Sequence, residues 1–119
     1  MHPRIQIGID SRDPEALAPF WAAALGFGIG EFDDDGVYLD LVPPDTSSPV
    51  VYFQRVPEDK HVKNRVHLDL YLSDPDAKIR ELLALGATRI GAPLSGAAGG
   101  WWQVMSDPEG NEFCICRED

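Results

Sequence analysis

Residues 5–27, IQIGIDSRDPEALAPFWAAALGF, and residues 66–87, VHLDLYLSDPDAKIRELLALGA, follow one pattern. Each stretch alternates apolar and polar residues, passes through Asp-Pro and an acidic residue into a helical periodicity, and then reaches Leu-Gly. Asp13 and Asp74 lie 61 positions apart, and Gly26 and Gly86 lie 60 apart. Because both ends of the helical stretch carry the same residue types, the sequence indicates two similar halves of about 60 residues.

Each half begins with a predicted strand that leads into a predicted helix. Period-two alternation gives each strand one apolar face. These faces comprise Ile5, Ile7, Ile9, Val66, Leu68, Leu70 and Leu72. Asp13 and Asp74 are predicted to cap helices whose first residue is the following proline. Gly26 and Gly86 are expected to end those helices in the left-handed conformation.

Three shorter extended segments are expected after each helix. They are predicted at 27–32, 36–42 and 50–56, and at 88–91, 101–106 and 112–116. The Asp35-Gly36 hairpin signal and the turn DPEGN at 107–111 separate them. The sequence therefore predicts an α+β fold of two β-α-β-β-β modules. Module one is expected at 1–56, a connector at 57–64 and module two at 65–119, as one domain, since neither half could bury its sheet alone.

Composition and charge restrict the class of partner. The 119 residues are 44% hydrophobic and 25% charged, and no apolar run approaches the roughly 20 residues that cross a bilayer. A net charge of −10 disfavours nucleic acids and anionic membranes. The start MHPRIQIGID lacks the long apolar stretch of a secretory signal. Cys114 and Cys116 are interpreted as reduced thiols, as in cytoplasmic proteins. We therefore expect a cytoplasmic protein with neither nucleic-acid nor membrane partners.

The strand faces directed away from the helices carry an unusual set of polar residues. They comprise Gln6, Asp10, Tyr52, Gln54, His67, Asp69, Tyr71, Glu112, Cys114 and Cys116. The set contains imidazole, amide, phenol and thiol groups but no lysine, which is typical of a small-molecule pocket; a solvated polar face is the alternative. Trp101 and Trp102 are neighbours on one strand, so one indole is expected to point inward and stack on a flat ligand, unless it serves only core packing.

The sequence resembles the vicinal oxygen chelate superfamily. The segments that carry the resemblance are DPEALAPFWAAALGF at 13–27, KNRVHLDLYLSDPDA at 63–77 and SDPEGNEF at 106–113. More narrowly, the chain is similar to the short glyoxalase-like proteins of the glyoxalase, bleomycin resistance and dioxygenase group. The resemblance implies that the paired modules curl their sheets into one half-barrel domain around a shared cavity, within a homodimer.

Metal-dependent members of that superfamily chelate an ion at four inward positions. By their place in the motifs, these positions match Gln6, Gln54, His67 and Cys114 here. None of the four is a carboxylate, although chemistry on vicinal oxygens requires hard anionic donors. We therefore predict a pocket without metal or other cofactor. A register shift that brings Glu112 into the fourth position is an alternative.

Two other catalytic arrangements remain open. Cys114 and His67 could form a nucleophile–base pair with Asp69 as the orienting group, although a buried cysteine that acts as a small hydrophobe is the simpler interpretation. Asp10 and Asp69 are related by the repeat and could form a carboxylate pair, or serve at the surface. The glycine-rich segment 96–100 is expected to form a mobile flap in front of the tryptophans.

The sequence thus predicts a small-molecule-binding, glyoxalase-like protein whose ligand it does not name. The expected ligand-binding residues are Gln6, Tyr52, Gln54, His67, Asp69, Trp102 and Cys114. The alternative is a metal-dependent lyase, isomerase or dioxygenase of the vicinal oxygen chelate type.

Overall fold

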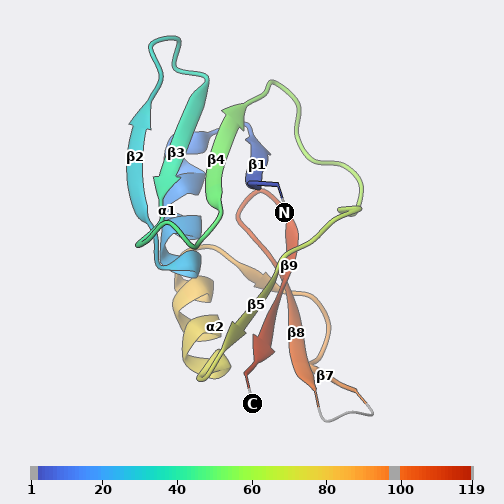
Figure 1. The fold of residues 1–119 in the computed structure, drawn as a ribbon. Helices are drawn as coiled ribbons and strands as arrows, with labels where there is room; N and C mark the ends of the chain where they lie inside the picture. Colours follow the sequence, from blue (N-terminus) through green and yellow to red (C-terminus); the bar gives the residue numbers. More distant parts are fainter. Residues whose placement is uncertain (1–2, 97–99, 119) are drawn as a thin grey trace. The chain divides into compact units, whose positions relative to one another are not determined.

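The computed structural model describes residues 3–96 and 100–118. The chain divides between Asp59 and Lys60 into two compact units, and each unit contains one β-sheet and one α-helix (Figure 1). Both units follow the β-α-β-β-β order, with one additional short strand in the second, so the predicted α+β fold of two such modules is confirmed. Their arrangement as one domain stays a prediction.

The first unit contains a four-stranded sheet with one helix on it. Its elements are β1 (Gln6–Ser11), α1 (Pro14–Leu25), β2 (Gly28–Phe32), β3 (Tyr38–Val42) and β4 (Val50–Arg55). The strand order is β1-β4-β3-β2, with β1 parallel to β4 and the other pairs antiparallel. The last strand of the module therefore returns beside the first, which the linear order of the elements does not reveal.

Helix α1 packs on β2, β3 and β4 and covers one face of this sheet (Figure 1). The buried side chains of the sheet alternate with exposed ones, as a sheet covered on one face requires. The core of this unit comprises Leu17, Phe20, Trp21, Leu39, Leu41, Val51 and Phe53. The opposite face carries the polar residues of β1 and β4.

The second unit repeats this plan around a shorter helix. Its elements are β5 (Asp69–Leu72), α2 (Pro75–Ala84), β6 (Thr88–Arg89), β7 (Leu94–Ser95), β8 (Trp101–Ser106) and β9 (Glu112–Arg117). The strand order is β5-β9-β8-β6, with β5 parallel to β9, and β7 pairs with β8. Strand β7 was not expected from the sequence, because two residues are too few to produce a periodic pattern.

The turn between β8 and β9 determines which residues of the second sheet face each other. The buried carboxylate of Asp107 accepts hydrogen bonds from the backbone N–H groups of Glu109 and Asn111 and from the Asn111 amide. Gly110 adopts φ +89°, a value that favours glycine. This closed turn places Cys114 beside Val104 and Cys116 beside Trp102.

Both helices begin at the predicted aspartate caps. Asp13 accepts a hydrogen bond from Ala16 N–H at 3.3 Å, and Asp74 accepts one from Ala77 N–H at 3.1 Å. Helix α1 ends as predicted at Gly26, which is left-handed at φ +71°. Helix α2 ends at Ala84 with Leu85 as its cap, and Gly86 follows at φ +106°, so the predicted glycine stop is confirmed here too. The N–H of Ala87 donates to the carbonyl of Leu82, as the N–H of Phe27 donates to the carbonyl of Ala22.

We expect Asp13→Ala and Asp74→Ala each to lower the free energy of unfolding by about 1 kcal/mol, because each leaves a helical N–H without its acceptor. Urea denaturation of the two variants measures this loss. An Asp34→Ala control, in the exposed hairpin tip, should change stability by less than about 0.5 kcal/mol. Equal effects at Asp13, Asp74 and Asp34 would contradict the capping role.

Two of the seven residues assigned to the apolar strand faces are exposed, while the other five are partly buried. Ile5 is 62% exposed and Val66 is 82% exposed. Both precede the first residue of their strands, and the described register gives neither a partner. The alternation therefore predicted the right faces but extended each strand too far toward its N-terminus.

The helices contain 12 and 10 residues. Within residues 3–96 and 100–118, no helix combines the length and apolarity needed to span a membrane.

Candidate functional site

The polar face of the first unit contains three of the predicted ligand-binding residues. Gln6, Tyr52 and Gln54 lie on the face opposite the buried side chains of β4, and the register pairs Tyr52 with Gly8. A Cβ atom at Gly8 would come within 2.6 Å of the Tyr52 hydroxyl oxygen. Glycine at this position therefore lets the Tyr52 ring lie across β1.

The second unit carries a pocket of about 340 Å³, and the buried thiols of Cys114 and Cys116 in β9 are among its lining residues. Its lining residues are His67, Asp69, Tyr71, Gly100, Trp101, Trp102, Cys114, Cys116 and Arg117. The volume lies within the range of small-molecule sites. The four ligand-binding residues that were predicted in this unit, His67, Asp69, Trp102 and Cys114, therefore border a single pocket.

Strand register explains why these side chains meet. Asp69 pairs with Cys114, and Tyr71 pairs with Cys116 across the parallel β5–β9 ladder. Because directly paired residues point to the same face of a sheet, the carboxylate, the phenol and both thiols lie together. Trp102 pairs with Cys116 from the other side and adds an indole.

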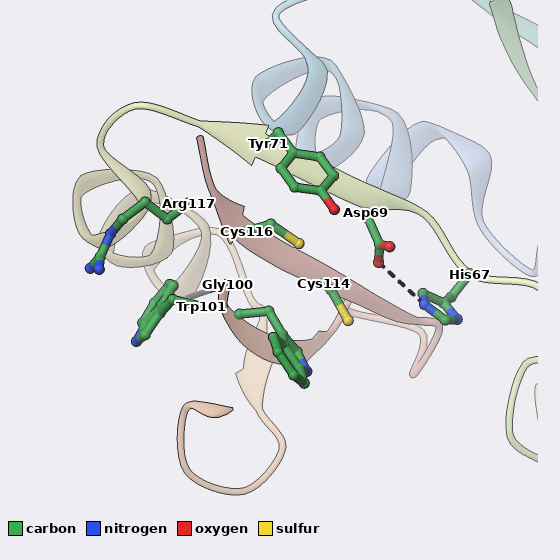
Figure 2. Close-up of a pocket in the computed structure, with 9 residues that line it drawn as sticks. His67, Asp69, Tyr71, Gly100, Trp101, Cys114, Cys116 and Arg117 are labelled. Atoms are coloured by element: carbon green, nitrogen blue, oxygen red, sulfur yellow. Dashed lines mark ion pairs between the residues drawn. The ribbon is translucent and has the colours of Figure 1, made fainter. Parts of the chain in front are cut away.

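The pocket has two chemically different ends. Figure 2 shows His67 and Asp69 at one end, with Trp101 and Arg117 at the other. The Arg117 guanidinium carbon lies 5.0 Å from the centroid of the Trp101 ring, a cation–π contact. One end therefore offers a carboxylate, while the other offers an aromatic surface covered by a cation.

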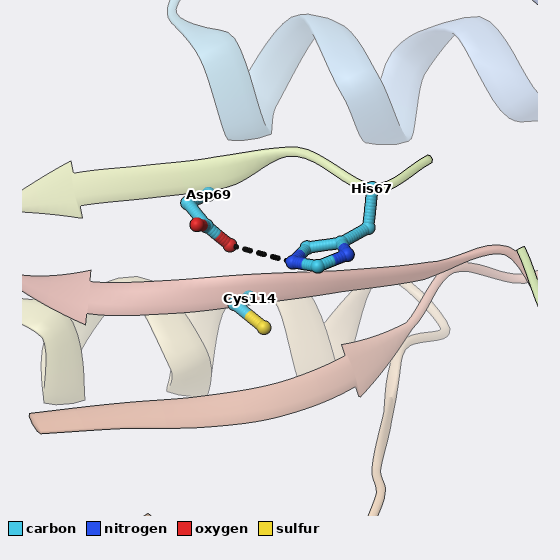
Figure 3. A group of neighbouring side chains, drawn as sticks. All are labelled: His67, Asp69 and Cys114. Carbon is cyan, nitrogen blue, oxygen red and sulfur yellow. Dashed lines mark ion pairs between the residues drawn. The ribbon is translucent and has the colours of Figure 1, made fainter. Parts of the chain in front are cut away.

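His67, Asp69 and Cys114 form a close group in the pocket. The distance from His67 Nε2 to Asp69 Oδ1 is 3.2 Å, and one donor atom from each of the three residues lies within 4.8 Å of the others. Figure 3 shows Cys114 on the strand beside the His67–Asp69 pair. His67 and Asp69 have side chains that are 46% and 44% exposed, whereas Cys114 is buried.

Burial keeps the two thiols protonated. It raises the pKa of Cys114 to about 11, and the negative charge and hydrogen bond of Asp69 act in the same direction. Burial, followed by the charge of Asp69, also raises the pKa of Cys116. A catalytic cysteine needs a lowered pKa or an effective base. The geometry thus brings Cys114 and His67 together, but the electrostatics disfavour the nucleophile–base pair that the sequence left open and favour the simpler interpretation of Cys114 as a buried, small apolar residue.

Glu112 does not occupy the fourth metal position for which the sequence made it an alternative. It pairs with Ser106 in a continuous β8–β9 register, so the register shift that would move it to the position of Cys114 is wrong. Its carboxylate instead binds the connector, with 2.9 Å to Lys60 Nζ and 2.9 Å to the backbone N of Asn64. Desolvation raises the pKa of Glu112, but these hydrogen bonds outweigh it and hold the pKa below its ordinary value.

Comparison with known proteins places the chain in a family. The family model described as a glyoxalase-like domain matches residues 6–116. The chain belongs to the glyoxalase-like domain family. No curated protein matches it.

Solved structures share the fold of this glyoxalase-like domain. A glyoxalase/bleomycin resistance protein/dioxygenase family enzyme from Burkholderia phytofirmans PsJN is 23% identical with a TM-score of 0.75, over 94% of this chain and 95% of that one. A bleomycin-binding protein complexed with bleomycin is 23% identical with a TM-score of 0.67, over 99% and 100%. A glyoxalase-related enzyme from Fulvimarina pelagi is 15% identical with a TM-score of 0.76, over 99% and 89%. At these identities the likeness establishes the fold.

The four residues that the resemblance assigns to metal positions do not fit a hard divalent ion. Gln6 and Gln54 offer neutral amides, His67 an imidazole and Cys114 a buried, protonated thiol. Hard ions such as Mg²⁺ or Mn²⁺ prefer carboxylate oxygens, which all four positions lack. No catalytic step that depends on such an ion follows from this glyoxalase-like domain.

Sequence reasoning missed part of this pocket. Trp101 and Arg117 line it, although neither was among the expected ligand-binding residues. Arg117 lies one residue beyond the predicted end of the last strand. Alternation places it on the face opposite Cys114 and Cys116, so no signal in the sequence assigned it to the pocket. Of the predicted flap at 96–100, residues 97–99 lie outside the described residues, while Gly100 borders the pocket.

Proposed function

We propose that this glyoxalase-like protein binds a small organic molecule in the pocket of its second unit, by direct contacts and without a divalent ion between protein and ligand. One observation carries the proposal: aromatic rings, two protonated thiols and a half-exposed His67–Asp69 pair border the same 340 Å³ space. A site with apolar walls and a few polar anchors is the usual form of a small-molecule pocket.

The lining favours a flat ligand that carries a hydrogen-bond donor. The rings of Tyr71 and Trp102 provide stacking surfaces, and Asp69 provides a carboxylate that accepts hydrogen bonds. The net charge of −10 attracts cations to the molecule as a whole. A planar aromatic amine matches these features better than an anion does. The bleomycin complex of a protein with the same fold supports small-molecule binding as a use of this architecture.

The proposal can be tested with a panel of planar heteroaromatic amines and their neutral and carboxylated analogues, followed by tryptophan fluorescence in buffer with chelator. We expect the amines to bind best, and Trp102→Ala to weaken their binding about 10–100-fold, because stacking on an aromatic side chain contributes about 1–3 kcal/mol. His67→Ala should weaken binding while the melting temperature stays unchanged, since the side chain is half-exposed.

Leu85→Ala provides the control, because Leu85 is an exposed apolar residue at the end of α2 that does not line the pocket. Its binding should equal that of the wild type. A panel without any binder, or a loss of affinity in chelator, would contradict the proposal; the second result would favour the metal-dependent lyase, isomerase or dioxygenase.

The predicted participation of Gln6, Tyr52 and Gln54 is part of this proposal, and Gln54→Ala in the same titration tests it. The homodimer and the cytoplasmic location stay predictions.

A further inference from the structure

We propose that His67, Asp69 and Cys114 also form a binding site for one borderline or soft divalent cation, of which Zn²⁺ and Cd²⁺ are examples. The site lies entirely in the second unit, between β5 with the residues that precede it and β9. It is an alternative occupant of the pocket, because the ion and an organic ligand would both require Asp69.

The distances suit a tetrahedral ion. Ligand bonds of about 2.0–2.2 Å from nitrogen and oxygen place two tetrahedral donors about 3.3 Å apart. His67 Nε2 and Asp69 Oδ1 already lie 3.2 Å apart. A zinc–sulfur bond of about 2.3 Å requires the sulfur about 3.6 Å from the other donors. The Cys114 donor lies within 4.8 Å of both, so it needs to approach by at most about 1.2 Å.

The chemistry of the donors selects the class of ion. One imidazole, one carboxylate and one thiol supply nitrogen, oxygen and sulfur, a set that suits zinc and softer ions rather than Mg²⁺ or Ca²⁺. This trio differs from the four superfamily positions, because its carboxylate comes from Asp69, two residues after His67, and no donor comes from the first unit.

The pocket gives the ion access to these donors. His67 and Asp69 present half-exposed side chains, while Cys114 lies on the buried floor. When the ion binds, the Cys114 S–H bond breaks, a metal–sulfur bond forms, and the proton passes to the buffer. Three protein ligands leave one position open toward the pocket, as in zinc sites that also hold water.

Titration of chelator-stripped protein with Cd²⁺ alone tests the proposal. We expect one ion per chain, an ultraviolet thiolate-to-cadmium absorption band, release of about one proton and a raised melting temperature. Asp69→Asn should weaken the affinity at least about tenfold. Replacement of a residue that only contacts a metal ligand already costs about 10–100-fold, and Asp69 is proposed to bind the ion itself. Cys114→Ser should abolish the band.

Cys116→Ser is the matched control, because Cys116 is the other buried thiol of β9 on the same face and is absent from the trio. It should retain the band and the affinity. Binding that is lost in Cys116→Ser, unchanged in Asp69→Asn, or equally tight for Mg²⁺ would overturn the proposed site. If Cys114→Ser does not fold, the affinity of the Asp69→Asn variant tests the site instead, because the half-exposed Asp69 side chain can be replaced without disturbing the core. Because the amine panel is measured in chelator, a failure of this site and a failure of the proposed function give different results.

Discussion

Replacement of Phe53 by alanine is expected to lower the free energy of unfolding by about 3–5 kcal/mol, the usual cost of removing a buried phenylalanine ring. Phe53 is 0% exposed and lies in β4, between β1 and β3. Its ring contributes to the core below α1, so truncation removes apolar burial and also leaves a cavity. Urea denaturation with a tryptophan fluorescence readout measures the loss.

Two control variants test whether the loss of stability comes from core packing or would follow any substitution in the sheet. Phe53→Leu keeps most of the volume and should cost less than about 1.5 kcal/mol. Val42→Ala lies on the adjacent strand at a side chain that is 52% exposed, and should change stability by less than about 0.5 kcal/mol. A loss at Phe53→Ala no larger than that at Val42→Ala would contradict the assigned core.

The second large effect is expected at Glu112. Glu112→Gln should lower the free energy of unfolding by about 1.5–3 kcal/mol, the contribution of hydrogen bonds to a charged group. The Glu112 carboxylate accepts from Lys60 and from the backbone of Asn64, while Asn64 Nδ2 donates to the backbone carbonyl of Glu112. Removal of the charge leaves the largely buried ammonium group of Lys60 without its counter-ion.

The contribution of Glu112 should depend on pH in a defined direction. The pKa of Glu112 in the folded chain lies below the ordinary value of 4.5, so the folded state binds a proton less readily than the unfolded state. The stabilisation is therefore complete above about pH 4.5 and is lost as the pH falls through the folded pKa. The stability difference between wild type and Glu112→Gln should shrink over that acidic window in pH-dependent denaturation.

Glu81→Gln provides the matched control for Glu112→Gln. Glu81 also pairs with a lysine, Lys78, at 2.7 Å, but its side chain is 51% exposed. Such surface pairs contribute little, so we expect a loss below about 0.5 kcal/mol. Equal losses at Glu81 and Glu112, or a difference that grows toward acidic pH, would show that Glu112 does not anchor the connector.

Much of the fold could be predicted because its signals are local. The aspartate caps at 13 and 74 and the turn at 107–111 act through hydrogen bonds within a few residues, and the structure contains all three. The exposed ends at Ile5 and Val66 and the short strand β7 could not be predicted in the same way. Their burial and pairing depend on how far a neighbouring strand extends, and a period-two pattern carries no information about that.

The candidate site also has features that local sequence signals predicted and features that depend on tertiary contacts. The polar faces that carry His67, Asp69 and Cys114 were predicted, because alternation assigns each residue of a strand to a side. The 3.2 Å contact between His67 and Asp69, and the Arg117 guanidinium over Trp101, were not. Glu112 was expected on the pocket face, yet it binds the connector, because partners 48 and 52 residues away compete for its carboxylate.

The sequence alone determined two β-α-β-β-β modules, the boundaries of most of their elements and the side of each sheet on which polar chemistry collects, because propensity, capping and alternation are properties of neighbouring residues. Tertiary structure decided that β9 lies between β5 and β8, which brings a carboxylate, an imidazole, two thiols and an indole to one pocket. Parallel pairing of strands more than 40 residues apart has no local signature, and the distances within the pocket follow from that pairing.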